Sequence, residues 1–226
     1  MVKTILILSP HADDAELGCG GYIARTIYEG GTVIVALATV GAIKFIHLDR
    51  EVTASEREEE FNKSMAVLGV QHTHILTRGL DSNLNTFPQG DMVGMLDSLQ
   101  KQYTPDEVLI PLPSAHQDHR YCWEVGVATT RPSAARHTPT MIAAYEYPLS
   151  SWGDGAAANS FTGGVYVNIE DYWEHKIEAL SQYGTQMRGQ YDLISTGGVE
   201  ALARLRGIEA GFKYAELLHA LRIRHK

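Results

Sequence analysis

The chain has 226 residues, of which 44% are hydrophobic and 20% charged, which fits one globular domain spanning residues 1–226. Its formal net charge of −8 argues against nucleic-acid binding, which needs a basic face. The sequence contains no run of about 18 apolar residues, so no membrane span is predicted. The apolar N-terminal run lacks the form of a signal peptide. The two cysteines, Cys19 and Cys122, make no disulfide framework, so we expect a cytoplasmic protein.

Strands and helices are predicted to alternate from the N-terminus to residue 145. Short apolar or β-branched runs predict buried strands, and apolar residues at helical spacing predict the helices between them. The expected elements, in chain order, are a strand at 2–8, a helix at 16–29, a strand at 32–39, a helix at 53–68, a strand at 74–76, a helix at 91–103, a strand at 107–110, a helix at 118–130 and a strand at 140–145. Thr53 and Glu56 offer a capping box for the second helix, and Gly69 ends it.

The C-terminal third is less regular. Residues 150–164 are rich in Gly, Ala, Ser and Asn and predict a loop, 165–169 predict a strand, and 171–183 and 199–221 predict two closing helices. The repeated order of strand and helix predicts an α/β fold, Rossmann-like and three-layered, with a mostly parallel central sheet and helices on both faces.

A first polar cluster, His11, Asp13, Asp14 and Glu16, follows the first predicted strand. Such sheets bind ligands beyond the carboxyl ends of their strands, so these side chains lie where a site is expected. His11 and Asp14 are three residues apart and can face one point, and imidazole nitrogen with carboxylate oxygen suits zinc. The alternative is an acidic helix start stabilised by the helix dipole.

The glycines that follow this cluster do not make a dinucleotide-binding loop. Gly18, Gly20 and Gly21 lack the spacing of that motif, and the acidic residues before them would repel a pyrophosphate. A nucleotide-binding α/β domain is therefore the less favoured interpretation.

A second cluster, His116, Asp118 and His119, follows the strand predicted at 107–110. A lone histidine is more often structural, but two histidines around an aspartate, at the same sheet edge as the first cluster, favour a site. One histidine from this loop would complete a site with His11 and Asp14. Three protein ligands leave open positions for water and substrate, as a catalytic zinc requires.

The two clusters closely resemble the motifs of the LmbE-like (PIG-L) deacetylase family. Its first motif, His-Pro-Asp-Asp-Glu before a glycine pair, is matched at residues 11–16, with Ala12 in place of proline and the glutamate one place later. Its second motif, His-x-Asp-His, is matched at residues 116–119 without departure. Further segments resemble the family's second helix, late helix and closing helix, at 55–70, 176–186 and 207–216.

The resemblance implies a Zn²⁺ cofactor held by three ligands, His11, Asp14 and His119. It implies that Asp13 is the general base on the metal-bound water. His116 would stabilise the oxyanion and act as the acid, with Asp118 orienting it. Homo-oligomers are common in the family, so the resemblance also implies self-association.

The resemblance further places Arg57 and Asp81 near the substrate. Each has an ordinary alternative: Arg57 as a surface ion pair with Glu60, and Asp81 as a turn residue. Ala115 stands where some relatives carry an arginine, which puts a substrate contact at that position in doubt. The pocket rim is expected from loops at 41–51, 81–90 and 150–164. Three aromatic residues are candidates for stacking on a sugar ring or for plain packing: Tyr145, Tyr147 and Trp152.

The expected function is a zinc-dependent hydrolase that removes an acetyl group from a small N-acetylated sugar or sugar conjugate. One alternative is an amidase that acts on a larger thiol–sugar conjugate with the same motif residues. Another is a non-catalytic zinc- or carbohydrate-binding module, which predicts that the base or the acid is missing, whereas Asp13 and His116 are both present.

Overall fold

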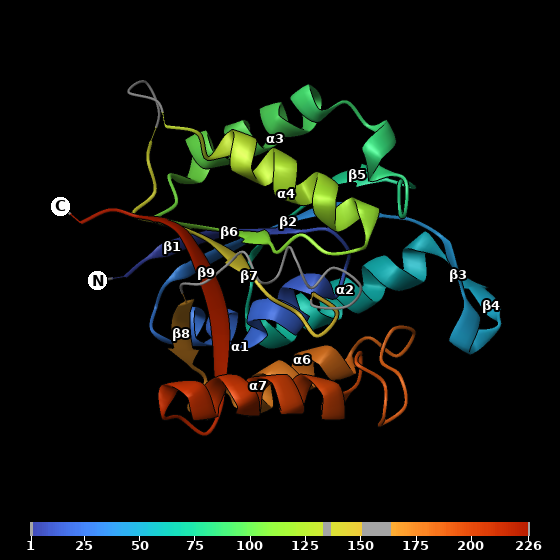
Figure 1. Ribbon diagram of the computed structural model, residues 1–226. Coiled ribbons are helices and arrows are strands. Elements are labelled where there is room, and N and C mark those ends of the chain that lie inside the picture. The colour runs from blue at the N-terminus through green and yellow to red at the C-terminus, as the bar shows by residue number, and fades with distance from the viewer. Residues whose placement is uncertain (1, 133–136, 151–163, 226) are drawn as a thin grey trace.

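The computed structural model describes residues 2–132, 137–150 and 164–225, which fold around a central sheet (Figure 1). The strands are β1 (Thr4–Ser9), β2 (Thr32–Val40), β3 (Ile43–Phe45), β4 (Arg50–Val52), β5 (His72–Arg78), β6 (Glu107–Pro111), β7 (Met141–Tyr145), β8 (Gly164–Asn168) and β9 (Ala215–Ile223). The α-helices are α1 (Asp14–Tyr28), α2 (Ala54–Leu68), α3 (Gln89–Tyr103), α4 (Gln117–Thr129), α6 (Trp173–Ser181) and α7 (Thr196–Ala210). Short 3₁₀ helices span Ile46–Leu48, Leu84–Thr86 and Glu170–Tyr172.

The central sheet has seven strands in the order β5-β2-β1-β6-β7-β9-β8. The first five run parallel, and β9 pairs antiparallel with both β7 and β8. The predicted α/β fold with a mostly parallel sheet and helices on both faces is confirmed. β1 lies at the centre, next to β2 and β6, so the chain changes direction across the sheet at this strand.

Helices cover both faces of the sheet, which explains the continuous apolar strands. In β1, Ile5 and Ile7 face the core beneath α1 and α2, whereas Leu6 and Leu8 face the core beneath α3 and α4. Figure 1 shows α3 and α4 on one side and α1, α2, α6 and α7 on the other. None of the helices in these described ranges has the length and apolar character needed to cross a membrane.

The predicted helix over residues 199–221 is wrong in its second half. Helix α7 ends at Ala210, and Gly211 closes it in the left-handed conformation with φ 80°. The chain then enters β9, where Leu218 pairs with Tyr145 of β7 and Val165 of β8. Residues 215–221 have good helix formers, but the edge of β7 offers backbone hydrogen bonds that outweigh this local preference. The segment at 207–216 that resembles a closing helix is therefore split between α7 and β9.

Other boundaries differ less. The helix predicted at 171–183 is a 3₁₀ turn followed by α6, and the strand predicted at 74–76 extends to His72–Arg78. The loop predicted at 41–51 contains the β3–β4 hairpin. Most of the loop predicted at 150–164 lies outside the described residues. The capping box of α2 is confirmed, since the Glu56 N–H donates to Thr53 Oγ1 at 3.2 Å and the Thr53 N–H donates to Glu56 Oε2 at 2.9 Å.

Helix α1 is broken in the middle, and a buried ion pair forms hydrogen bonds with the backbone groups at the break. Cys19 has a non-helical φ of −143°. The Glu216 carboxylate accepts the N–H groups of Gly21 and Tyr22 at 2.9 and 2.7 Å. Lys176 Nζ lies 2.5 Å from Glu216 and donates to the Leu17 carbonyl at 2.9 Å. β9 and α6 thus fix the helix whose first turn carries Asp14.

Candidate active site

The two polar clusters meet beyond the carboxyl ends of β1 and β6, which are neighbouring strands. The loop after β1 enters α1, and the loop after β6 enters α4. Ser9 shapes the first loop, because its hydroxyl donates to the His11 carbonyl at 2.7 Å and accepts the Ala15 N–H at 3.1 Å. The site therefore lies where an open parallel sheet binds ligands.

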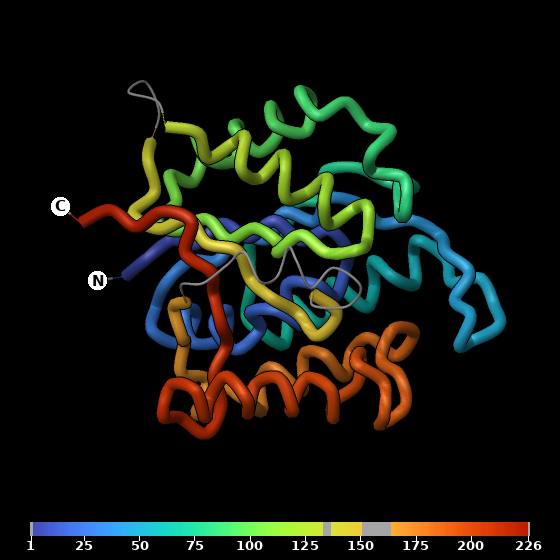
Figure 2. Tube along the Cα trace, viewed as in Figure 1, coloured from blue at the N-terminus to red at the C-terminus, as the bar shows by residue number. Residues whose placement is uncertain are grey.

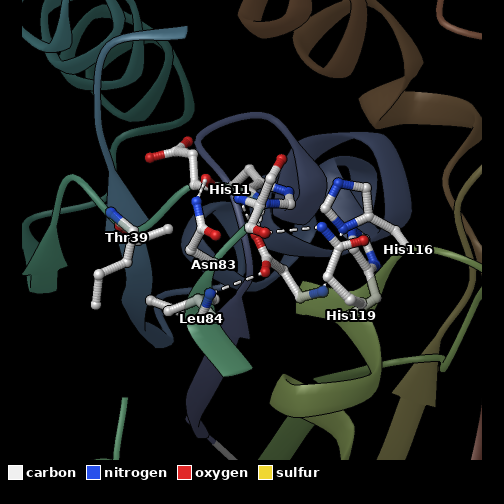
Figure 3. Close-up of polar contacts among 12 residues, drawn as sticks. His11, Thr39, Asn83, Leu84, His116 and His119 are labelled. Atoms are coloured by element: carbon white, nitrogen blue, oxygen red, sulfur yellow. Dashed lines mark hydrogen bonds and ion pairs between the residues drawn. The ribbon is translucent and has the colours of Figure 1, made fainter. Parts of the chain in front are cut away.

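His11, Asp14 and His119 come together around one carboxylate oxygen. Asp14 Oδ2 is 3.1 Å from His11 Nδ1 and 3.1 Å from His119 Nε2. The three residues can each offer a ligand atom within 4.8 Å of the other two, and Figure 3 shows both imidazoles turned toward the same point. His119 Nδ1 is buried without a hydrogen-bond partner among the described residues. Two imidazoles and a carboxylate whose ligand atoms lie this close together are a donor set that fits a zinc ion.

The charges of this group are strongly coupled. Burial lowers the pKa of His11, but the hydrogen bonds that its ring donates to Asp118 and Asp14 outweigh this effect and raise the pKa to about 10. Burial would raise the pKa of Asp14, yet His119 and His11 hold it well below its usual value. The protein alone therefore keeps a buried carboxylate beside positive charge, an arrangement that a cation can take over.

Asp13 lies beside the group of candidate metal ligands, His11, Asp14 and His119, without belonging to it. It is the residue before α1, but its side chain makes no capping hydrogen bond. The residue is 8% exposed and contributes to the cavity that contains His11 and His119. Burial first, and then the negative charge of Asp14, raise the pKa of Asp13 to about 7. A carboxylate with this pKa can accept a proton near neutral pH.

His116 caps helix α4 with its ring. Its Nδ1 accepts the backbone N–H of Asp118 at 3.2 Å, so the proton of the neutral ring is on Nε2. Burial, followed by the positive charges of His11 and His119, lowers the pKa of His116 to about 4. Its ring lies 4.9 Å from that of His11 (Figure 3). A neutral His116 can thus donate a hydrogen bond from Nε2 next to the ligand group.

The Asp118 carboxylate makes its hydrogen bond to the ring of His11 and not to that of His116, which it was expected to orient. Its Oδ2 lies 2.9 Å from His11 Nε2 and accepts the Ser82 N–H at 2.6 Å, and its Oδ1 accepts the Leu84 N–H at 3.1 Å (Figure 3). The hydrogen bond between Asp118 and the His116 ring comes from the Asp118 backbone N–H. His11, His116 and Asp118 form a second group with metal-ligand spacing, but every acceptor oxygen of Asp118 already receives a protein hydrogen bond.

A cavity of about 150 Å³ opens over these residues. Its lining joins the two motif loops to the β3–β4 hairpin, α2 and the segment after α6. The described lining residues are His11, Asp13, Asp14, Leu17, Ile43, Phe45, Arg57, Asp81, Ser82, His116, His119, Tyr147, Leu149, Gln186, Arg188 and Ile194.

Arg57 and Asp81 contribute to this cavity as a buried ion pair. Arg57 Nη1 contacts Asp81 Oδ1 and donates to the Gly41 carbonyl at 3.0 Å. The alternative pairing of Arg57 with Glu60 is wrong, because the Glu60 carboxylate accepts the backbone N–H and the hydroxyl of Thr185 at 2.8 and 2.5 Å. The sequence did not indicate the Arg57–Asp81 pair, since it joins α2 to the loop after β5.

The three aromatic residues proposed to stack on a sugar differ in their surroundings. Tyr145 is fully buried and donates to the Leu8 carbonyl at 2.8 Å, so it cannot stack on a sugar. Tyr147 is in the cavity lining, but its ring stacks on His119 at 4.6 Å and its hydroxyl lies 3.0 Å from Ser114 Oγ. Trp152 lies outside the described residues.

Phe45 lies in the segment 41–51 that was expected to form the pocket rim, whereas sequence reasoning missed Arg188 and Ile194. Phe45 is at the end of β3, and the other two belong to the segment between α6 and α7. Arg188 and Ile194 stand where the sequence has no motif and no periodic pattern. Only the folded chain brings their segment over the strand ends, so no local signal could have identified them.

Known proteins share this architecture. The family model PIG-L, described as GlcNAc-PI de-N-acetylase, matches residues 6–130. A diacetylchitobiose deacetylase from Thermococcus kodakarensis is 27% identical over 224 residues, which cover 95% of this chain and 82% of that protein.

Two solved structures illustrate the fold. The N,N'-diacetylchitobiose deacetylase from Pyrococcus horikoshii is 22% identical with a TM-score of 0.78, over 97% of this chain and 84% of that one. GalB, the 4-carboxy-2-hydroxymuconate hydratase from Pseudomonas putida KT2440, is 18% identical with a TM-score of 0.79, over 100% and 98%. At these identities the likeness shows the fold alone, and the residues of the site must decide the chemistry.

Proposed function

Because this chain belongs to the PIG-L family, whose model covers more than half of it, we propose that it is a zinc-dependent hydrolase that removes the acetyl group from an N-acetylated sugar or sugar conjugate. One observation carries the proposal. A single oxygen of Asp14 is shared by His11 and His119, while Asp13 and His116 contribute to the same cavity with no role in that group. A zinc site with a spare base and a spare donor supports hydrolysis, and a merely structural zinc site needs neither.

Zinc fits the site, where His11, Asp14 and His119 would hold it. When bound, zinc supplies Lewis acidity that activates water and polarises a carbonyl. Asp118 would keep the His11 ring in place through its 2.9 Å contact with Nε2, as carboxylates commonly do for zinc-bound histidines.

Asp13 carries the proton in the proposed reaction, and His116 stabilises the oxyanion. The Asp13 carboxylate accepts a proton from the attacking water as the C–O bond forms. His116 Nε2–H donates a hydrogen bond to the developing oxyanion and keeps its proton, and the proton on Asp13 passes to the amine as the C–N bond breaks. The products are acetate and a free amino sugar. Asp13 is thereby returned to its ionised form, and no covalent intermediate with the chain forms.

Arg57 and Asp81 are proposed as contacts for the sugar. Both contribute to the cavity with the motif residues, and their side chains fix one another, so they present a rigid polar wall. Besides their mutual contact, Arg57 Nε and Asp81 Oδ2 lack a hydrogen-bond partner in the described parts of the chain.

The decisive experiment is acetate release by zinc-loaded protein from a panel of N-acetylated sugars. Asp13→Ala should abolish turnover and retain zinc, whereas His119→Ala should lose zinc. Full activity in Asp13→Ala would overturn the assignment of the base, and unchanged zinc content in His119→Ala would overturn the ligand set. A larger thiol–sugar amide in the panel tests the amidase alternative. Zinc binding without acetate release from any substrate would favour the non-catalytic module.

A further inference from the structure

Arg188 is a cation of the cavity lining that the proposed reaction does not use. The part of the lining that the structure describes contains two arginines, and they differ in environment. Arg57 is buried and held by Asp81 and the Gly41 carbonyl. The side chain of Arg188 is 36% exposed. Arg188 therefore brings a guanidinium group to the solvent side of a cavity whose floor is the motif residues.

The backbone around Arg188 is well fixed. Its N–H donates to the Ile194 carbonyl at 2.8 Å, and the Asp192 N–H donates to the Gly189 carbonyl at 2.9 Å. The preceding turn is tied to the β3–β4 hairpin, because His47 Nε2 lies 3.0 Å from the Thr185 carbonyl. Figure 2 shows this segment and the hairpin on the same side of the molecule, away from the chain ends. Arg188 thus lies in a well-fixed segment at the edge of the cavity.

The present partner of Arg188 is a weak one. Arg188 Nη1 lies 3.4 Å from both oxygens of Asp192, whose side chain is 37% exposed. Asp192 Oδ1 also accepts the Ile194 N–H at 3.0 Å, and this bond is the first cause of the lowered pKa of Asp192. An exposed ion pair at this distance contributes little net stability. The Asp192 carboxylate therefore mainly stabilises the turn through its hydrogen bond with the Ile194 N–H. The Arg188 guanidinium has N–H groups left to donate to another acceptor.

The charges of the lining favour an anion at this place. Arg57 and Asp81 neutralise one another, and a divalent cation in the motif site would balance Asp13 and Asp14. Arg188 then remains as a positive charge with no matching carboxylate in the described lining, since its exposed neighbour Asp192 is not one of the lining residues. A guanidinium recognises carboxylate and phosphate groups by paired hydrogen bonds.

We propose that Arg188 binds an anionic group of the substrate, a carboxylate or a phosphate attached to the N-acetylated sugar on the side away from the acetamide. The inference rests on the proposed function and narrows it to acidic sugar conjugates. Arg188 is here a specificity residue and takes no part in bond breaking.

Matched substrates test this inference. The carboxymethyl glycoside of N-acetylglucosamine and its carboxamide have the same shape and differ by one charge, and N-acetylglucosamine 1-phosphate tests a phosphate. Calorimetry on zinc-loaded Asp13→Asn protein measures binding without turnover. The acids should bind about tenfold or more tightly than the carboxamide, as expected for a charge-assisted hydrogen bond. The preferred acid identifies the anionic group.

Arg188→Gln in the same background should bring the affinities of acid and carboxamide together and leave carboxamide binding unchanged. Arg204→Gln is the matched control, because Arg204 forms an exposed pair with Glu200 on α7, and it should keep the preference. In the active enzyme, Arg188→Gln should raise KM for the acid with little change in kcat.

Equal binding of acid and carboxamide by the Asp13→Asn protein, or a preference that survives Arg188→Gln, would overturn the inference. The proposed function fails by a different result, the absence of acetate release from every substrate by active protein. Acetate release from neutral and acidic substrates at equal KM would leave the hydrolase and remove only the role of Arg188.

Discussion

Asp13 is a residue whose surroundings disfavour the ionised form of its side chain. Its carboxyl is buried beside Asp14, and both effects raise its pKa to about 7. A raised pKa means that the folded state binds the proton more tightly than the unfolded state. The protonated carboxyl therefore favours folding, and this contribution is lost as the pH rises from the ordinary value of about 4 toward about 7.

We expect metal-free Asp13→Asn protein to be more stable than metal-free wild type above neutral pH, by about 1–3 kcal/mol. The amide mimics the neutral carboxyl, so the gap should narrow between about pH 8 and about pH 5. Urea unfolding of chelator-treated proteins at both pH values measures it. A gap that is absent, or that widens toward acid, would contradict the burial of an ionisable Asp13.

Asp118 makes a separable prediction. If its carboxylate orients His11, Asp118→Asn should weaken zinc binding about 10–100-fold, the usual effect of losing the partner of a metal-bound histidine. Competition with a fluorescent chelator measures the zinc affinity, and the exposed Asp171→Asn serves as the control. Unchanged zinc affinity with a large fall in kcat would return Asp118 to the role of orienting His116.

Among the elements, those with a local signal were predicted well. The buried run of β1, the capping box of α2 and the loop entry into α1 each depend on neighbouring residues, and the structure has them. Elements that depend on distant partners were not. β9 has a helix-forming sequence and becomes a strand because its backbone pairs with β7 and β8. The β3–β4 hairpin has only three residues in each strand, too few for a visible alternation.

The candidate site divides in the same way. The motif residues were found because each cluster is contiguous and follows a strand. The pairings Arg57–Asp81 and Asp118–His11 were missed because each joins a helix to a loop that follows a different strand. The charge of a residue can be read from the sequence, but its partner is set by the folded sheet.

The ion pair at the break in α1 leads to an element-scale prediction. Lys176 is buried and contacts Glu216 and the Leu17 carbonyl, so Lys176→Met leaves a buried carboxylate without its cation. We expect a loss of about 3–5 kcal/mol of unfolding free energy. Lys63→Met is the matched control, because Lys63 pairs with Glu59 on the exposed face of α2 and should cost less than about 1 kcal/mol. Equal effects in urea unfolding would show that the break in α1 does not need the pair.

At the scale of the whole molecule, the candidate metal site joins two halves of the sheet. Its ligands come from the loop after β1 and from α4, which follows β6. Zinc bound there would contact both sides of the point where the chain changes direction, and a ligand that binds only the folded state stabilises it. Zinc should therefore raise the unfolding temperature of the described fold as one transition.

The size of that shift should depend on pH. In the metal-free protein burial lowers the pKa of His11, but its bonds to Asp118 and Asp14 raise it to about 10, so His11 holds a proton through the neutral range. Zinc must displace this proton, and the displacement is easier as the pH rises. The stabilisation by a fixed zinc concentration should grow by about 1.4 kcal/mol per pH unit for one proton released.

Thermal unfolding with and without zinc at about pH 6 and about pH 8 measures this dependence. His11→Gln should abolish it, and His72→Gln should keep it, because His72 lies on the edge strand β5 against Tyr103. A zinc shift of equal size at both pH values would mean that zinc displaces no proton from the protein. His11 would then be neutral before the metal arrives, and its contacts with two carboxylates would have to rearrange in the metal-free fold.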